Sequence, residues 1–267
     1  MRQKPFFGNS IIITGASSGI GRELALQLAG QGAWLTLAAR NANELDHVAD
    51  LCRQKGGSAI AVPTDISDDG QCRRLIDHAI GEYGKIDTLI NNAGIGHASR
   101  FDKMQDLSSA EKVMSVNFWG SVYCTHHALK YLKQTRGRIV VVNSGAGKAC
   151  SPNCSFYAAS KYALDGFFGS LRLEIEASGV TITSVYPPWV ATGISSRAIG
   201  LDGRPVGGVS PVETGARSVS WCAKVILSAM QKRKREELMT SLHKVGNIIK
   251  PIFPSLIDQV SKKAYQD

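Results

Sequence analysis

Short runs of apolar and β-branched residues alternate along the chain with longer stretches in which apolar residues recur at helical spacing. This alternation predicts a doubly wound α/β fold, in which a seven-stranded parallel sheet carries helices on both faces. The strands are expected to begin near Ser10, Ala33, Ser58, Ile86, Gly137, Val180 and Glu236. The helices are expected over Gly19–Ala29, Asn43–Gln54, Asp68–Tyr83, Ser108–Gln134, Phe156–Ala177 and Pro211–Met230.

Two segments do not follow this rhythm. Residues 187–210 are rich in Gly and Pro and too long for a simple connection, which is typical of a lid over a substrate site. Residues 242–267 alternate apolar side chains with lysines, and Pro251 and Pro254 divide them into two short amphipathic helices. This basic, apolar C-terminal extension either packs on the protein or a subunit partner, or contacts a membrane surface. We interpret residues 1–267 as one domain, because α/β folds with one sheet reach this length.

The composition is that of a globular protein, and its charge narrows the possible partners. The chain has 31 Lys and Arg against 22 Asp and Glu, a formal charge of +9 that favours anionic partners such as phosphates or acidic lipid. The basic residues are scattered apart from the run at 232–235, and no nucleic-acid recognition motif is present, so we expect no nucleic-acid partner. The six cysteines lack C-x-x-C spacing, so neither a metal site nor a disulfide framework is expected.

The start of the chain and its apolar runs bear on its location. The first predicted strand begins at Ser10, which leaves no room for a signal peptide, and no apolar run reaches membrane-spanning length. We therefore expect a cytoplasmic protein, with peripheral membrane contact through the C-terminal extension as an open alternative.

A glycine-rich turn directly follows the first strand and precedes a helix. Its sequence, TGASSGIG over residues 14–21, is the strand–turn–helix context of a dinucleotide site. The glycines let the backbone approach a pyrophosphate, and the helix N-terminus offers free N–H groups. The alternative is a purely structural turn. The expected contacts here are Gly15, Ser17, Ser18, Gly19, Ile20 and Gly21.

The end of the second strand indicates which dinucleotide binds. An NAD site usually places Asp or Glu there to hold the ribose hydroxyls, but this chain has Ala39, Arg40 and Asn41. The Arg40 guanidinium can pair with a 2′-phosphate, which favours NADP(H) over NAD. The alternative is that Arg40 is a solvated residue at the strand end.

Two more motifs complete a pattern. NNAG occupies residues 91–94 after the fourth strand, and YAASK occupies residues 157–161 on a helix. Together with the glycine turn, they occur in an order and spacing that resembles the short-chain dehydrogenase/reductase family over about residues 10–192. The resemblance implies a Rossmann fold and one site that is built from these motifs.

Four residues match the catalytic positions of that family. Tyr157 and Lys161 lie four apart on one helix face, where the ammonium favours the ionised phenol. The resemblance implies that Tyr157 exchanges a proton with the substrate oxygen and that Lys161 also binds the nicotinamide ribose. It further implies that Ser144, at the carboxyl end of the fifth strand, binds the substrate oxygen. Asn117 matches the residue that holds a water in the proton relay behind Lys161.

The resemblance also supplies the other cofactor contacts. Asp65 matches the position that binds the adenine amino group, and Thr192 matches the nicotinamide carboxamide contact. The chain departs from the family at Pro188, where Gly is usual, and proline removes a backbone donor and restricts φ. The remaining contacts implied are Asn41, Ile66, Asn92, Ala93, Gly94, Tyr157, Lys161, Pro187 and Val190.

These features predict an NADP(H)-dependent oxidoreductase that transfers hydride between nicotinamide and a carbonyl or alcohol. Phe156, Trp189 and Ile194 suggest an apolar or lipid-like ketone or aldehyde as the substrate. The alternative is a non-catalytic NADP(H)-binding scaffold or sensor, although such proteins typically lose the Tyr or the Lys. The resemblance implies a homodimer or homotetramer formed through the helices that contain Asn117 and Tyr157.

Overall fold

The central sheet has seven strands, all parallel, in the order β3-β2-β1-β4-β5-β6-β7. The computed structural model describes residues 4–207 and 215–263. The strand order reverses between β1 and β4, and in open parallel sheets ligands bind at such a switch point, outside the carboxyl ends of the strands. The predicted fold is confirmed. The strands are β1 (Ser10–Thr14), β2 (Trp34–Ala39), β3 (Ser58–Pro63), β4 (Thr88–Asn91), β5 (Arg138–Val142), β6 (Thr181–Tyr186) and β7 (Glu236–Leu238).

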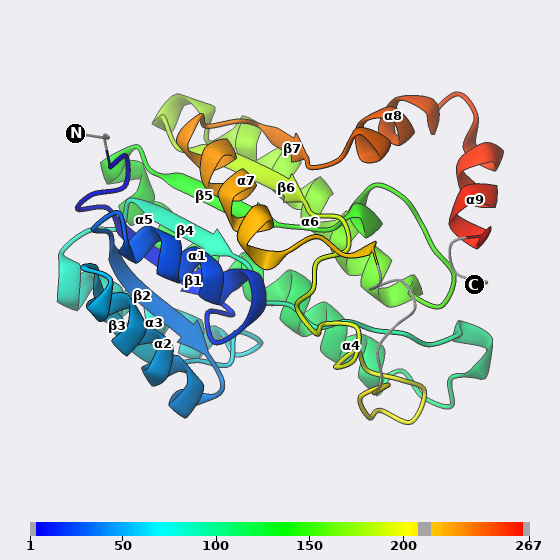
Figure 1. Cartoon of the computed structure of the whole chain (residues 1–267), viewed down its shortest axis with the longest axis horizontal. Coiled ribbons are helices and arrows are strands. Elements are labelled where there is room, and N and C mark those ends of the chain that lie inside the picture. The colour runs from blue at the N-terminus through cyan, green and yellow to red at the C-terminus, as the bar shows by residue number, and fades with distance from the viewer. Residues whose placement is uncertain (1–3, 208–214, 264–267) are drawn as a thin grey trace.

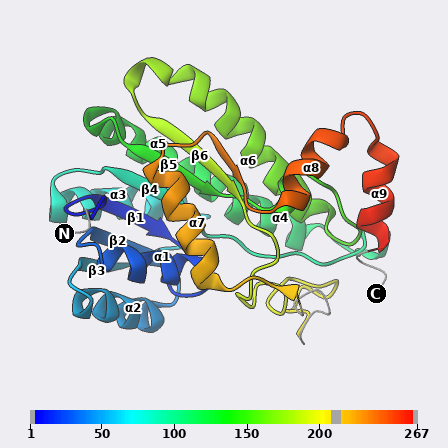
Figure 2. The same ribbon diagram turned by 45° about the horizontal axis from the view of Figure 1, so that its top comes forward.

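Helices cover both faces of this sheet, as Figures 1 and 2 show. One apolar core includes buried residues of α1, α2 and α7, and the other includes buried residues of α3, α5 and α6. The helices are α1 (Gly19–Ala29), α2 (Ala42–Gln54), α3 (Asp69–Tyr83), α4 (Ser108–Met114), α5 (Gly120–Thr135), α6 (Ser155–Glu174), α7 (Val219–Gln231), α8 (Ser241–Ile249) and α9 (Pro254–Lys263).

Strand β1 explains why the sheet needs both layers of helices. All five of its residues are buried. Because side chains alternate along a strand, Ile11 and Ile13 enter the core with α1, while Ile12 enters the core with α3. A central parallel strand therefore reads as a continuous apolar run.

Two helices differ from the sequence prediction. The long helix expected over Ser108–Gln134 contains a π-helical turn, Ser115–Trp119, between α4 and α5. The helix expected from Pro211 begins at Val219, where the Ser218 side chain accepts a hydrogen bond from the Trp221 N–H. Arg217, just before it, forms a parallel bridge opposite Val190 through backbone hydrogen bonds with Trp189 and Ala191, so residues 215–218 are not α-helical; residues 208–214 lie outside the described part.

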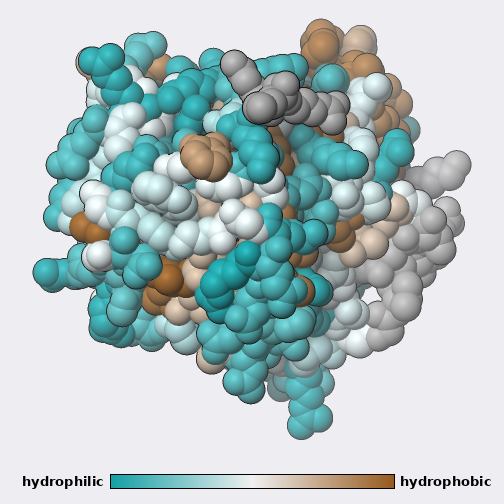
Figure 3. Space-filling model, turned by 60° about the vertical axis from the view of Figure 1, so that its left-hand side comes forward, coloured by the Kyte–Doolittle hydropathy of each residue, from teal (hydrophilic) through white to brown (hydrophobic). Residues whose placement is uncertain are grey.

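The two short helices expected near the C-terminus are α8 and α9, separated by Pro251. In both ribbon views they lie at the opposite end of the molecule from α2, and α8 lies beside the end of α6 (Figures 1 and 2). Figure 3 shows the face turned toward α2 and α3: it is mostly hydrophilic, and hydrophobic residues form small groups with a larger one at its upper right edge.

Candidate active site

The glycine turn after β1 is packed against the segment that follows β4. Gly15 has φ of +67°, and a Cβ there would lie 2.8 Å from the Ala93 Cα. A Cβ on Gly21 would collide with the Gly15 carbonyl oxygen and lie 2.5 Å from Asn92 Nδ2. Only glycine fits these two positions, because any side chain there would overlap neighbouring atoms of Gly15, Asn92 or Ala93.

Thr14 and Asn92 join the two motifs by hydrogen bonds. The Asn92 amide donates to the carbonyls of Thr14 at 2.9 Å and Gly15 at 3.3 Å. The Thr14 hydroxyl accepts from the backbone N–H groups of Asn92 and Ala93, both at 3.0 Å. No role for Thr14 was expected from the sequence, although its position as the first residue of the T-G-x-x-x-G-I-G motif is the signal that could have revealed it.

The N-terminus of α1 faces the same turn. Ser18 is extended at the N-cap position, and within the described residues its side chain makes no capping hydrogen bond to the helix. Its first N–H groups are therefore open to an anion. A Cβ on Gly19 would lie 3.2 Å from Thr192 Cβ, so the structure brings Thr192 to this turn. Ser17, Ser18 and Ile20 are half-buried around it.

The residues expected at the adenine end lie after β2 and β3. Burial alone would raise the pKa of Asp65, but hydrogen bonds from Ser67 and the charges of Arg40 and Lys112 leave that pKa below its usual range. Asp65 and Arg40 therefore lie within electrostatic reach of each other. Arg40 is exposed and able to meet a phosphate, whereas the exposed Asn41 caps α2 by accepting from the Glu44 N–H at 3.3 Å.

Ile66 has a packing position rather than an open one. It is buried, and a Cβ on Gly120 would lie 2.5 Å from Ile66 Cδ1. Gly120 therefore lets α5 approach the segment that follows β3. Because its side chain is used in packing, Ile66 would contact a nucleotide only through its backbone.

Tyr157 and Lys161 lie one turn apart on α6, as their spacing predicted. The Lys161 ammonium is 5.7 Å from the centre of the Tyr157 ring and donates to the Val142 carbonyl at 3.2 Å. Burial lowers the pKa of Lys161 to about 8. A buried ammonium next to a phenol stabilises the ionised form of that phenol, which is the property that acid–base chemistry at Tyr157 requires.

Asn117 is fixed next to this pair by the π-helical turn. Its Oδ1 accepts from the Ile95 N–H at 2.8 Å, and its Nδ2 donates to the Ile95 carbonyl at 3.1 Å and the Ser160 hydroxyl at 3.0 Å. The Ser160 hydroxyl in turn donates to the Tyr157 carbonyl at 2.7 Å. π-turns inside helices are frequent at functional sites, and this one aims Asn117 at the segment after β4.

Gly94 brings the NNAG motif to the same place. A Cβ there would lie 3.2 Å from Asn117 Oδ1 and 3.8 Å from Lys161 Nζ. The structure therefore brings Gly94, Asn117 and Lys161 together, although they come from three separate motifs.

Ser144 is connected to α6, which carries Tyr157 and Lys161, through hydrogen bonds of Asn143, a residue with no role predicted from the sequence. Asn143 is buried after β5; its amide donates to the Lys161 carbonyl at 3.1 Å, and its Oδ1 accepts from the Ser144 N–H at 3.0 Å. The Ser144 hydroxyl accepts from the Ala146 N–H at 3.2 Å and so caps the short turn Gly145–Gly147. Asn143 had a signal, because an amide directly before a strand-end Ser is well placed to orient it.

The segment after β6 is attached to two neighbouring loops. The buried Pro187 accepts from the Gly145 N–H at 3.2 Å, and the Thr192 N–H donates to the Val190 carbonyl at 2.7 Å. Further along, Ile199 exchanges backbone hydrogen bonds with Gly96 and Ala98. Pro188, which replaces the family's usual glycine, is half-buried in this segment.

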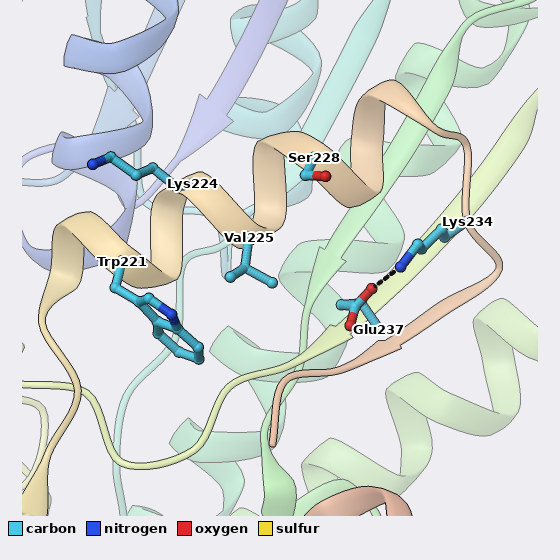
Figure 4. Close-up of a pocket in the computed structure, with 6 residues that line it drawn as sticks. All are labelled: Trp221, Lys224, Val225, Ser228, Lys234 and Glu237. Atoms are coloured by element: carbon cyan, nitrogen blue, oxygen red, sulfur yellow. Dashed lines mark hydrogen bonds and ion pairs between the residues drawn. The ribbon is translucent and has the colours of Figure 1, made fainter. Parts of the chain in front are cut away.

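A pocket outside this site lies between α7 and β7. Its volume is about 310 Å³, and Figure 4 shows the residues that line it, including the ion pair of Lys234 and Glu237; none of the predicted site residues is among them. Within residues 4–207 and 215–263, no cluster of potential metal ligands occurs, the six cysteines are free, and no helix is long and apolar enough to cross a membrane.

Comparison with known proteins places this geometry in a family. A family profile described as short chain dehydrogenase matches residues 9–199. The chain is 38% identical over 262 residues to 11-beta-hydroxysteroid dehydrogenase 1A of Arabidopsis thaliana, covering 94% of this chain and 74% of the relative. It is 37% identical over 268 residues to 11-beta-hydroxysteroid dehydrogenase A of Arachis hypogaea, covering 97% and 76%.

A solved structure agrees with this assignment. A short chain dehydrogenase/reductase from Burkholderia phymatum, in complex with NAD, superposes with a TM-score of 0.84 at 25% identity and covers 97% of both chains. The matched profile, the relatives and the fold agree, and the chain belongs to the short-chain dehydrogenase/reductase family of oxidoreductases.

Proposed function

We propose that this chain is an NADP(H)-dependent oxidoreductase that interconverts a carbonyl and an alcohol, with Asn117, Ser144, Tyr157 and Lys161 as its catalytic residues. The observation that carries the proposal is the buried Lys161 ammonium beside the Tyr157 ring, connected through Asn143 to Ser144. A purely structural helix has no need for a buried lysine, because desolvation of its charge opposes folding.

The residues present fit a dinucleotide. Gly15 and Gly21 leave a bare backbone where any side chain would collide, and the open N-terminus of α1 offers N–H groups to a pyrophosphate. Arg40, exposed at the end of β2 where an acidic residue would select NAD, supports NADP(H). Asp65, Ile66, Asn92, Ala93, Gly94, Pro187, Val190 and Thr192 are proposed to complete this site.

We infer what the protein's own residues contribute to the reaction from their arrangement. When bound, the nicotinamide supplies or accepts the hydride at the substrate carbon. Tyr157 donates a proton to the carbonyl oxygen in reduction and accepts it in oxidation, while the Ser144 hydroxyl holds that oxygen. Lys161 lowers the cost of the Tyr157 phenolate, and Asn117 fixes the backbone behind Lys161 so that a water can return the proton.

The substrate is proposed to be an apolar or lipid-like ketone, aldehyde or alcohol. Phe156, next to Tyr157, packs with Phe101 and His97 at ring distances of 6.0 Å, so aromatic side chains border the site. Residues 187–210 are proposed as the lid; within the described part of this segment, Ile199 bonds to the loop after β4. The names of the relatives, 11-beta-hydroxysteroid dehydrogenases, support a polycyclic apolar alcohol or ketone.

A cofactor and substrate screen tests this function. Oxidation of NADPH and of NADH is followed by the absorbance of the reduced nicotinamide, with a panel of steroid and simpler apolar ketones. Turnover with NADPH is expected to fall about 10²- to 10⁴-fold in Tyr157→Phe and to stay unchanged in the control Tyr131→Phe. Tight NADPH binding without turnover of any carbonyl compound would instead favour the scaffold or sensor.

We also propose peripheral membrane contact through the C-terminal extension. Large apolar side chains of α8 and α9 are exposed, and basic residues accompany them, which is the pattern of a helix lying on an anionic surface. Binding of the full chain to acidic vesicles is expected to fall with added salt. Equal sedimentation with and without vesicles would contradict it.

A homodimer or homotetramer formed through α5 and α6 is proposed as well. Trp119 and Leu173, at the ends of these helices, are exposed large apolar residues. Sedimentation equilibrium is expected to give a dimer or tetramer mass, which Leu173→Glu lowers. A monomer mass for the unmodified chain would contradict this assembly.

A further inference from the structure

The C-terminal extension touches the turn that carries Ser144. We define the arm as residues 241–250, that is α8 and the following Lys250. A Cβ on Gly145 would lie 2.9 Å from both Cε1 and Nε2 of His243. The imidazole therefore packs directly on the residue that follows Ser144.

The other end of the same turn is bonded to the end of the arm. The Lys250 ammonium donates to the Lys148 carbonyl at 2.6 Å and to the Tyr162 hydroxyl, and it lies 4.9 Å from the centre of the Tyr162 ring. Tyr162 follows Lys161 on α6. The arm thus contacts the start of the turn at Gly145, its end at Lys148, and α6 next to the catalytic lysine.

Ion pairs also attach the turn to α6 and β7. The Lys148 ammonium pairs with Asp165 of α6 at 2.9 Å and with Glu236 of β7 at 3.5 Å. Asp165 also accepts a hydrogen bond from Tyr186, which is fully buried at the end of β6. These mostly buried ion pairs hold the side chain of Lys148, and the arm holds the backbone carbonyl of the same residue.

The two faces of the arm differ in kind. Toward the protein it presents His243, whose ring packs on Gly145, and Lys250, whose ammonium donates to the Lys148 carbonyl. Its large apolar residues Leu242, Val245 and Ile248 are exposed on the outside. The arm is therefore held to the Ser144 turn by hydrogen bonds and one ring contact rather than by burial of its apolar side chains.

We propose that the arm is a positioning element for Ser144, in which His243 and Lys250 fix the turn Gly145–Lys148 and so set the direction of the Ser144 hydroxyl. The inference rests on the proposed function, in which Ser144 holds the substrate oxygen. The phosphate and adenine contacts of the nucleotide should not depend on the arm, because the glycine turn and Arg40 follow β1 and β2, whereas the arm follows β7 at the sheet edge. The arm should therefore affect turnover much more than NADPH affinity.

Substitutions in the full chain separate these two effects. In His243→Ala and Lys250→Met, kcat is expected to fall about 10- to 100-fold, because small displacements of a reacting group have effects of this size. Lys250→Arg, which retains a donor for the Lys148 carbonyl, is expected to recover most of the loss. The matched control is Lys244→Met, an exposed lysine of the same helix. NADPH dissociation constants are expected to agree within twofold across the set.

The contact with Gly145 allows a second, coupled test. Gly145→Ala places a methyl group against the His243 ring, so the ring or the turn must shift, and turnover is expected to fall. In the His243→Ala background the collision partner is gone, so adding Gly145→Ala is expected to cause little further loss of turnover. A double variant whose loss equals the product of the two single losses would overturn the proposed contact.

Hydrogen exchange of the backbone keeps the proposal testable without any known substrate. Amides of residues 144–149 are expected to exchange faster in His243→Ala and Lys250→Met, while Lys244→Met matches the unmodified chain. Unchanged exchange, or a loss of kcat equal to that of Lys244→Met, would overturn the role of the arm. Absence of turnover in the unmodified chain, with the exchange pattern as expected, would instead count against the proposed function.

Discussion

Helix α1 and the α8–α9 pair both carry an apolar stripe, but the two stripes differ in burial. In α1 the stripe is fully buried, and Leu24 and Leu28 are 0% exposed. In α8 the corresponding side chains face outward, with Leu242 72% and Ile248 69% exposed. The apolar pattern of a helix therefore indicates that a surface will cover it, but not which surface.

The difference follows from where each helix meets the sheet. Helix α1 directly follows β1, the third of the seven strands in the sheet order, so its apolar side lies over neighbouring strands. Helix α8 follows β7, a three-residue strand at the edge, where no further strand remains to be covered. The position in the sheet order thus decides whether a stripe serves the core or remains available for an outside partner.

The largest effect on stability is expected at the buried stripe. Leu28→Ala removes a fully buried side chain beside β1 and leaves a cavity, which should lower the free energy of unfolding by about 2–5 kcal/mol. Denaturant unfolding measures it. A loss below about 1 kcal/mol would mean that α1 is no better packed than α8, and the contrast would fail.

A somewhat smaller effect is expected from the buried charge of Lys161. Its pKa in the folded chain is lowered to about 8 from the ordinary value of 10.5, so between these pH values the unfolded chain binds a proton that the folded chain does not. Stability should therefore rise with pH across this window, by on the order of 3 kcal/mol. The measurement is the stability of the unmodified chain relative to Lys161→Met from pH 7 to 10.5, and a flat difference would contradict the burial of the charge.

A change at the exposed Arg40 should affect binding rather than folding. Arg40→Leu is expected to weaken NADPH binding about tenfold, because a charge-assisted contact to the 2′-phosphate is lost, and to leave NADH binding nearly unchanged. Fluorescence titration of both reduced nucleotides gives the ratio. An equal loss for both would show that Arg40 does not select the phosphate.

The smallest effect on stability is expected at the exposed stripe. Ile248→Ala, the counterpart of Leu28→Ala on α8, should change the unfolding free energy by less than about 0.5 kcal/mol, since the side chain is already in solvent. Differential scanning calorimetry of the two variants gives the comparison directly. A large loss at Ile248 would mean that an assembly partner covers α8 in solution.

Local sequence was enough for the motifs but not for the residues that connect them. Gly15, Gly21 and the Tyr157–Lys161 pair were predicted because short motifs in the chain mark their positions. Asn143 and Ser160 were missed because their partners come from other elements: Asn143 spans β5 and α6, and Ser160 joins α6 to the turn of Asn117. No periodicity marks such long-range hydrogen bonds.

Helix ends show the same limit. The last long helix was expected from Pro211, but Arg217 takes part in backbone pairing with Val190, and the helix starts only after Ser218. A helical pattern does not reveal that a distant loop competes for the same backbone groups.

The sequence by itself determined the doubly wound sheet and the position of the glycine turn, since strand runs, glycine spacing and helical period are local properties of the chain. Only the tertiary structure decided that Lys161 is buried, that Asn143 joins Ser144 to α6, and that His243 packs on Gly145. Those facts depend on which elements pack together, because burial and contact arise between segments that are far apart in the sequence.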